Sequence, residues 1–226
     1  MVDYIFKETK MTKQNYTDIT FVLDRSGSMS VIREETITGF NVFLSEQQKV
    51  PGKATMTLAQ FDHEYEMVYE ARQLKDTPAL NGDTYVPRGY TALLDAIGRT
   101  INSTGNRLAG MQEDQRPDKV IFVILTDGLE NYSKEFNSSR INEMIKSQRA
   151  NYQWEFVFLG ANQDAIDVAG NIGIEAAAAM TFTANTVGTG YLYGAISRNI
   201  ASYRTGQSTG VSFSDEDRQK QTDAAT

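Results

Sequence analysis

One stretch decides the fold of this chain: Ile19-Thr20-Phe21-Val22-Leu23-Asp24-Arg25-Ser26-Gly27-Ser28-Met29. Its first half, Ile19–Leu23, is mostly apolar, which is typical of a strand buried on both faces of a parallel sheet. The run ends at Asp24, and residues 25–28 then form a turn with side chains that commonly cap helices. From residue 31 to 48 the apolar spacing is helical. The stretch therefore predicts a buried strand, a tight turn and a helix.

The same order of strand and helix continues along the chain. Two strands joined only by residues 62–64 are too closely linked for a crossover, so they predict an antiparallel hairpin. The apolar run Val120–Leu125 predicts a central buried strand. Strands are expected at 19–23, 56–61, 65–69, 120–125, 154–159 and 180–183, and helices at 31–48, 91–108, 139–149, 163–172 and 189–203.

This alternation predicts a doubly wound, Rossmann-like α/β fold, with a mostly parallel central sheet, one antiparallel edge hairpin and helices on both faces. Residues 17–204 are expected to form one domain. Residues 1–16 are expected to be a polar lead-in, and residues 205–226 a flexible polar tail. Ligands of such folds bind beyond the carboxyl ends of the strands, where the strand order reverses.

The composition excludes several functions. With 22 Lys and Arg against 29 Asp and Glu, the 226-residue chain has a formal net charge of −7, which argues against nucleic-acid binding. It has no Cys, so it has no disulfide framework or thiolate metal site. No apolar run reaches the roughly 18–20 residues that span a bilayer. We expect a cytoplasmic protein that binds neither nucleic acid nor membrane.

Three segments should meet at the carboxyl end of the sheet. Asp24, Ser26 and Ser28 lie on the turn after the first strand, Thr91 lies where a helix starts, and Asp127 follows the strand at 120–125. Together they offer two carboxylates and three hydroxyls, and such all-oxygen sets suit hard cations such as Mg²⁺, Mn²⁺ or Ca²⁺. Without a cation the two nearby carboxylates should repel each other, which raises one pKa.

Each segment also has a plainer interpretation. Ser26 and Ser28 are able to cap the helix that follows them, Thr91 to serve as an N-cap, and Asp127 to end a strand in a turn. The conjunction favours a cation site, because two apolar strands each lead directly into an Asp and two helices start beside the hydroxyls.

These motifs resemble a known family. Asp24-x-Ser26-x-Ser28 after a first strand, Thr91 before a helix, and Asp127 in a Leu-Thr-Asp-Gly string are similar to the metal-ion-dependent adhesion site of von Willebrand factor type A (vWA) domains. The resemblance covers roughly residues 17–203. The short chain is similar to stand-alone vWA proteins of bacteria and their phages.

The resemblance implies a role for each residue. Ser26 and Ser28 bind the cation through their hydroxyls, and Thr91 binds it directly or through water. Asp24 and Asp127 stand behind them and hold water or hydroxyl groups, although one of them sometimes ligates directly. An Asp or Glu carboxylate from a protein partner completes the coordination. The family therefore implies a cation-dependent protein-binding module rather than an enzyme.

Two other functions are compatible with the sequence. A Mg²⁺-dependent phosphatase or hydrolase would use Asp24 as its nucleophile, but such enzymes need an acid two residues later, where this chain has Ser26. The second alternative is a mainly structural role as a component of an assembly. In the surrounding loops, His63 is expected to be a solvated turn residue. Arg88 is hypothesised to help attract an acidic partner. The other candidate contact residues are Tyr85, Tyr90, Glu130, Asn131 and Tyr132.

Overall fold

The computed structural model describes residues 15–161 and 164–226. Almost all of the expected lead-in, residues 1–14, and the first residue of the helix expected at 163–172 therefore lie outside the described residues. In the described part, six strands form one sheet: β1 (Tyr16–Asp24), β2 (Lys53–Phe61), β3 (Tyr65–Gln73), β4 (Lys119–Thr126), β5 (Glu155–Ala161) and β6 (Ala179–Phe182). The α-helices of the same part are α1 (Arg33–Lys49), α2 (Leu93–Ala109), α3 (Ser138–Tyr152), α4 (Ala165–Asn171), α5 (Thr186–Thr205) and α6 (Asp215–Asp223).

The sheet has the strand order β3-β2-β1-β4-β5-β6, and every neighbouring pair is parallel except β2 and β3. The predicted doubly wound fold with one antiparallel edge hairpin is confirmed. From β1 the chain proceeds outward to β2 and β3, whereas from β4 it proceeds the other way to β5 and β6. The strand order therefore reverses between β1 and β4, and the carboxyl ends of these two strands define the place where doubly wound folds bind ligands.

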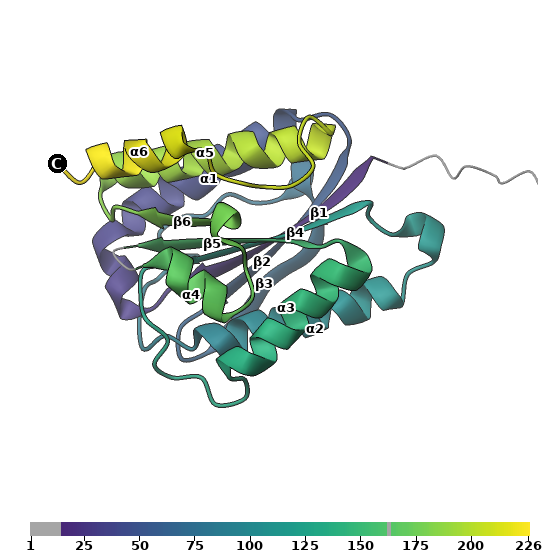
Figure 1. Cartoon of the computed structure of the whole chain (residues 1–226), viewed down its shortest axis with the longest axis horizontal. Coiled ribbons are helices and arrows are strands. Elements are labelled where there is room, and N and C mark those ends of the chain that lie inside the picture. Colours follow the sequence, from purple (N-terminus) through teal and green to yellow (C-terminus); the bar gives the residue numbers. More distant parts are fainter. Residues whose placement is uncertain (1–14, 162–163) are drawn as a thin grey trace, which may run out of the picture.

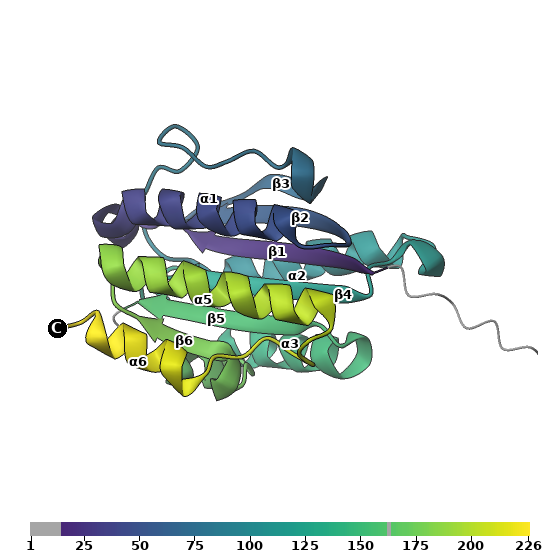
Figure 2. The same cartoon turned by 90° about the horizontal axis from the view of Figure 1, so that it is seen from above.

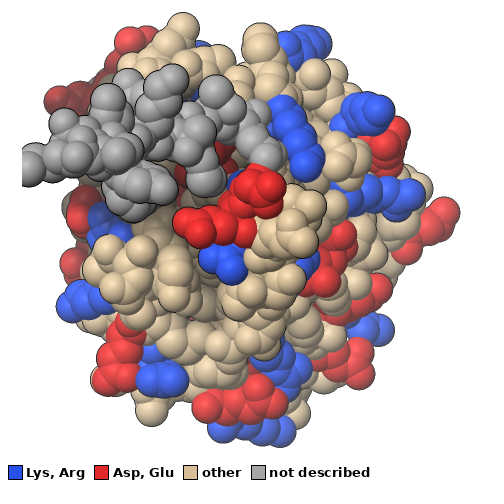
Figure 3. Space-filling model, turned by 90° about the vertical axis from the view of Figure 1, so that its right-hand side faces the viewer, with Lys and Arg blue, Asp and Glu red and all other residues tan. Residues whose placement is uncertain are grey.

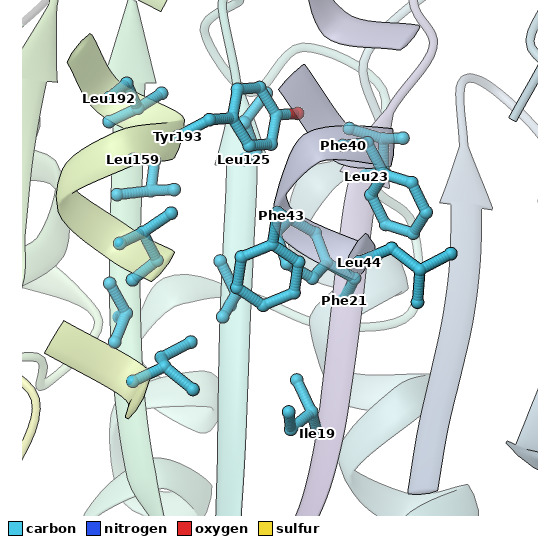
Figure 4. Packing of buried hydrophobic residues seen from close by; sticks show 14 of the residues in the cluster. Ile19, Phe21, Leu23, Phe40, Phe43, Leu44, Leu125, Leu159, Leu192 and Tyr193 are labelled. Atoms are coloured by element: carbon cyan, nitrogen blue, oxygen red, sulfur yellow. The ribbon is translucent and has the colours of Figure 1, made fainter. Parts of the chain in front are cut away.

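Helices cover both faces of the sheet. Helices α1, α5 and α6 lie on one face, and α2, α3 and α4 lie on the other (Figures 1 and 2). On the first face the ring of Phe21 in β1 packs edge-on against Phe40 and Phe43 of α1, with centroids 5.3 and 5.2 Å apart (Figure 4). On the second face Val22 and Ile124 are buried with side chains of α2 and α3. Because β1 is buried on both sides, its end at Asp24 is held firmly.

The expected flexible tail is wrong for the described chain. Residues 211 and 213, a Val and a Phe, are buried, and Asp215–Asp223 form α6 beside α5 (Figure 2). Ser214 and Asp217 make a capping box at the start of this helix. Gln221 then joins two elements, because its Oε1 accepts a hydrogen bond from Thr183 N and its Nε2 donates one to Gly188 O. A polar segment is thus fixed by tertiary contacts.

The amino ends of the strands form the opposite end of the molecule. Lys and Arg side chains alternate there with Asp and Glu, and no patch of one sign is visible on the uncovered part of this face (Figure 3). No helix in the described part of the chain is long and apolar enough to cross a bilayer.

Candidate metal centre

Asp24 is the last residue of β1, and its buried carboxylate joins β1 to β4. Its Oδ1 accepts a hydrogen bond of 2.6 Å from the backbone N of Ser26, and its Oδ2 accepts one of 2.5 Å from the hydroxyl of Thr126. Burial raises the pKa of Asp24 to about 7, against the lowering effect of these hydrogen bonds. The side chain is therefore poised between its neutral and its charged form near neutral pH.

The two serines of the turn do not cap the helix that follows. Ser26 precedes a 3₁₀ helix at Gly27–Ile32, yet its side chain makes no capping hydrogen bond. Instead the hydroxyls of Ser26 and Ser28 lie 3.2 Å apart, and the Ser28 hydroxyl donates a 2.6 Å hydrogen bond to Oδ1 of Asp127. The plainer interpretation of these residues as helix caps is therefore wrong, and their oxygens face one another and the acid that follows β4.

Thr91 is also not a helix cap. Helix α2 begins at Leu93 with Ala92 in the capping position. The backbone of Thr91 is fixed by Asn131, whose side-chain Oδ1 accepts from Thr91 N at 2.9 Å and whose N donates to Thr91 O at 3.0 Å. Sequence reasoning expected the helix to open two residues earlier. Because it starts later, the Thr91 hydroxyl is not engaged in capping.

Gly128 shows how closely the three hydroxyls converge. A Cβ built on this residue would lie 3.0 Å from Oγ1 of Thr91, 3.4 Å from Oγ of Ser28 and 3.7 Å from Oγ of Ser26. Three hydroxyls from two distant segments thus lie within 3.7 Å of one point beside Gly128. Neutral oxygen donors around one point, with two carboxylates bonded to them or close behind, are a donor set that fits a hard dication.

Backbone hydrogen bonds hold the loops in this arrangement. Arg25 N donates to Phe61 O at 2.7 Å, Arg88 N donates to Arg25 O at 2.7 Å, and Gly27 N donates to Gly89 O at 3.2 Å. The buried hydroxyl of Tyr85 donates to Asp24 O at 2.7 Å. The long irregular stretch before α2 is therefore attached along the turn that carries the serines. Tyr85 supports the site from within the protein rather than offering a contact surface.

Two acids hold the loop after β4 in place through hydrogen bonds to backbone N–H groups, a role that the sequence did not indicate. Glu130 accepts from Leu94 N at 2.9 Å and from Ser133 N at 2.7 Å, so it satisfies a free donor at the start of α2. Asp95 in turn accepts from the backbone N of Lys134 and Glu135, each at 2.9 Å. These reciprocal bonds tie the loop that follows Asp127 to the helix that follows Thr91. The bonds between the two segments join residues 36 to 40 positions apart in the chain, so no local sequence pattern indicates them.

Asp62, at the tip of the β2–β3 hairpin, is a further residue that sequence reasoning missed. Its Oδ2 accepts from Nε of Arg25 at 3.1 Å and from Nε of Arg88 at 2.8 Å. Although burial acts to raise its pKa, these cations and a hydrogen bond from Glu64 N lower it. Arg88 also pairs with Glu64 at 2.6 Å, so the positive charge hypothesised to attract an acidic partner is already compensated within the protein.

His63 lies beside the same group. Its ring meets those of Tyr90 and Tyr132 edge-on, with centroids 6.4 and 6.1 Å apart, and these two tyrosines stack on each other at 5.2 Å. Asp62, His63 and Glu64 are close enough together to hold a metal ion. Both acids bind Arg88, however, and its positive charge opposes a second cation there.

The predicted rise of a carboxylate pKa is confirmed, but repulsion between the two acids is not its main cause. The pKa of Asp127 is raised, as is that of Asp24, and burial is the leading cause for both. Repulsion from Asp127 raises the pKa of Asp24 as well, as the smallest of the contributions.

Comparison with known proteins identifies the family. A family model described as von Willebrand factor type A domain matches residues 18–192. Because the match covers well over half of the chain, the chain belongs to the vWA family, whose members are metal-dependent adhesion or protein-interaction modules and are typically not enzymes. No curated relative matches the chain in sequence.

Several solved structures share the fold. Proximal thread matrix protein 1 from the mussel byssus, solved with a zinc-occupied adhesion site, is 16% identical with a TM-score of 0.58, and the match covers 82% of this chain and 46% of that one. A vWA protein from Catenulispora acidiphila is 12% identical (TM-score 0.54; 84% and 43% covered). The vWF domain of the type V pili tip protein Mfa5 from Porphyromonas gingivalis is 10% identical (TM-score 0.56; 88% and 97% covered). The chain thus spans less than half the length of the first two.

Proposed function

We propose that this chain is a protein-binding module that depends on a divalent cation. The hydroxyls of Ser26, Ser28 and Thr91 would hold the cation, with Asp24 and Asp127 behind them. One observation carries the proposal: these three hydroxyls lie within 3.7 Å of a single point beside Gly128, and none of them is used as a helix cap. Mg²⁺, Mn²⁺ and Ca²⁺ all accept such oxygen ligands, and one neighbour of this fold holds zinc.

The chemistry of the donor set explains why a partner would bind. Neutral hydroxyls leave much of a dication's positive charge uncompensated, so the bound cation would attract an outside anion. The side-chain carboxylate of an Asp or Glu on a partner protein supplies that anion. Asp24 is buried and accepts hydrogen bonds from the turn after β1 and from β4, so it would orient the ligands rather than meet the partner.

The enzymatic alternative has less support. Asp24 is fully buried and bonded on both carboxylate oxygens, which suits a positioning residue better than a nucleophile. His63, the single His of the chain, contacts Asp62, Tyr90 and Tyr132, so its described contacts are not those of a base for Ser26 or Ser28. A role as a component of an assembly is the second candidate function, since the neighbours include a thread matrix protein and a pili tip protein. A cytoplasmic location and a bacterial or phage source stay predictions from the sequence.

Titration calorimetry with Mn²⁺, Mg²⁺ and Ca²⁺ tests the site. We expect one cation per chain, and a loss of binding in Ser26→Ala/Ser28→Ala. Gly128→Ala should also weaken binding, because its methyl group would enter the space between the hydroxyls. Ser30→Ala is the matched control, since Ser30 is an exposed serine of the same 3₁₀ helix. Equal cation binding by the double variant and the control would refute the proposed site.

A further inference from the structure

Three strongly exposed apolar side chains stand next to predicted cation ligands in the chain. Val31, Leu129 and Tyr90 expose 76%, 66% and 62% of their surface. Tyr90 precedes Thr91, Leu129 follows Gly128, and Val31 lies three residues after Ser28. Together they form what we call the apolar collar, and each of its members stands within three residues of a predicted cation ligand.

This concentration is not a general property of the surface. Among the described residues, only one other large apolar side chain is more than 60% exposed, and that is Tyr152 at 64%. Tyr152 is the last residue of α3 and precedes β5, so it lies at the amino end of the sheet, away from the collar. Exposed apolar groups gathered around one site mark a surface that a macromolecule covers.

The charged side chains around the collar are largely compensated. Arg88 pairs with Asp62 and Glu64, and Arg25 pairs with Asp62 and Glu66. Lys134 holds its ammonium 4.4 Å from the ring centroid of Tyr132. A partner with a cluster of acids would meet few free cations here, whereas a cation between the hydroxyls would offer one place for one carboxylate.

Tyr90 adds rigidity to the collar. Its ring stacks on Tyr132 with an interplanar angle of 7° and meets His63 edge-on. A preorganised aromatic ring loses little conformational entropy when it is covered, which makes such residues effective interface anchors.

We infer that the partner presents a single carboxylate flanked by large apolar side chains, rather than an acidic patch. This inference rests on the proposed function and adds the chemistry of the partner surface. The carboxylate approaches the cation, and its apolar neighbours cover Val31, Leu129 and Tyr90. Attraction between the two proteins is then local, so binding depends only weakly on ionic strength.

Synthetic disulfide-closed peptide loops test the inference. Each carries one central Asp, flanked by Leu and Phe in the first loop, by Glu and Asp in the second, and by Ser in the third. Affinities for the full chain are measured by a surface biosensor in Mn²⁺ and in EDTA, at low and at high salt. We expect the apolar loop to bind at least tenfold more tightly than the other two, only in Mn²⁺, and with little dependence on salt.

Variants of the chain locate the contact. Leu129→Ser and Val31→Ser should each weaken binding of the apolar loop several-fold, whereas Tyr152→Ser, an equally exposed apolar residue elsewhere, should not. Lys134→Gln should also leave the affinity unchanged. Cation binding, measured separately, should be the same in all four variants.

The outcomes separate the inference from the proposed function. Mn²⁺-dependent binding that favours the acidic loop, or that ignores Leu129 and Val31, overturns the apolar collar and leaves the proposed function standing. Binding that persists in EDTA or after the central Asp is changed to Asn overturns both. Absence of binding by all three loops also overturns both.

Discussion

The pKa of Asp24 gives a sharp prediction about stability in the absence of metal. Burial raises the pKa of Asp24 to about 7 in the folded protein, from 3.8 for an aspartate in water. Between these two values the folded chain holds one proton more than the unfolded chain at this position, so stability falls as pH rises. At 1.36 kcal/mol per pKa unit, the difference of about 3 units amounts to about 4 kcal/mol in total, most of it between pH 4 and pH 7.

The assay is urea unfolding in EDTA at a series of pH values. Other groups titrate over the same range, so the quantity to compare is the difference between the wild-type chain and Asp24→Asn. The carboxamide keeps an acceptor for Ser26 N and removes the charge. We expect the variant to gain on the wild type by up to about 4 kcal/mol as pH rises from 4 to 7. Asp76→Asn, at an exposed position, is the control.

Saturating Mn²⁺ should reverse the effect, because the cation binds the ionised form and competes with the proton. The reasoning is refuted if the free energy of unfolding of wild type and Asp24→Asn changes in parallel over this pH range. It is equally refuted if the difference grows toward acid pH, since that would mean a lowered pKa.

Three further predictions concern cation and packing. Mn²⁺ at a hundred times its dissociation constant should stabilise the fold by about 2.7 kcal/mol, seen as a higher melting temperature that Ser26→Ala/Ser28→Ala does not show. Gln221→Ala removes the acceptor of Thr183 N and a buried donor to Gly188 O, and should cost about 1–3 kcal/mol in chemical unfolding, whereas exposed Gln219→Ala should cost little. Gly39→Ala places a methyl group 2.1 Å from the Tyr193 ring and should lower stability by about 1–3 kcal/mol through overpacking, and an unchanged unfolding midpoint would contradict the close packing of α1 on α5.

The central part of the fold was readable from the sequence because its causes are local. Apolar runs such as Ile19–Leu23 and Val120–Leu125 are removed from water on both sides only in a strand that is covered on both faces of the sheet. The short turn at residues 62–64 allows only an antiparallel hairpin. Once β1 and β4 are neighbours, Asp24 and Asp127 must end at the same edge, and the candidate site follows from topology.

Features that depend on distant partners were not readable. Residues 205–226 have the composition of a solvated tail, and α6 forms because Val211 and Phe213 find apolar cover and Gln221 finds two backbone partners. The ion pairs that occupy Arg88 join it to a hairpin some 25 residues away in the chain. No local pattern indicates such a pairing.

The sequence by itself determined which side chains reach the carboxyl edge of the sheet, because strand burial and turn chemistry are set by neighbouring residues. Only the tertiary structure decided what those side chains do there. It placed the start of α2 two residues after Thr91 and thereby kept that hydroxyl out of the helix cap. It also buried Asp24 between β1 and β4, and the loss of water around that carboxylate, which no neighbour in the chain dictates, shifts its pKa toward neutrality.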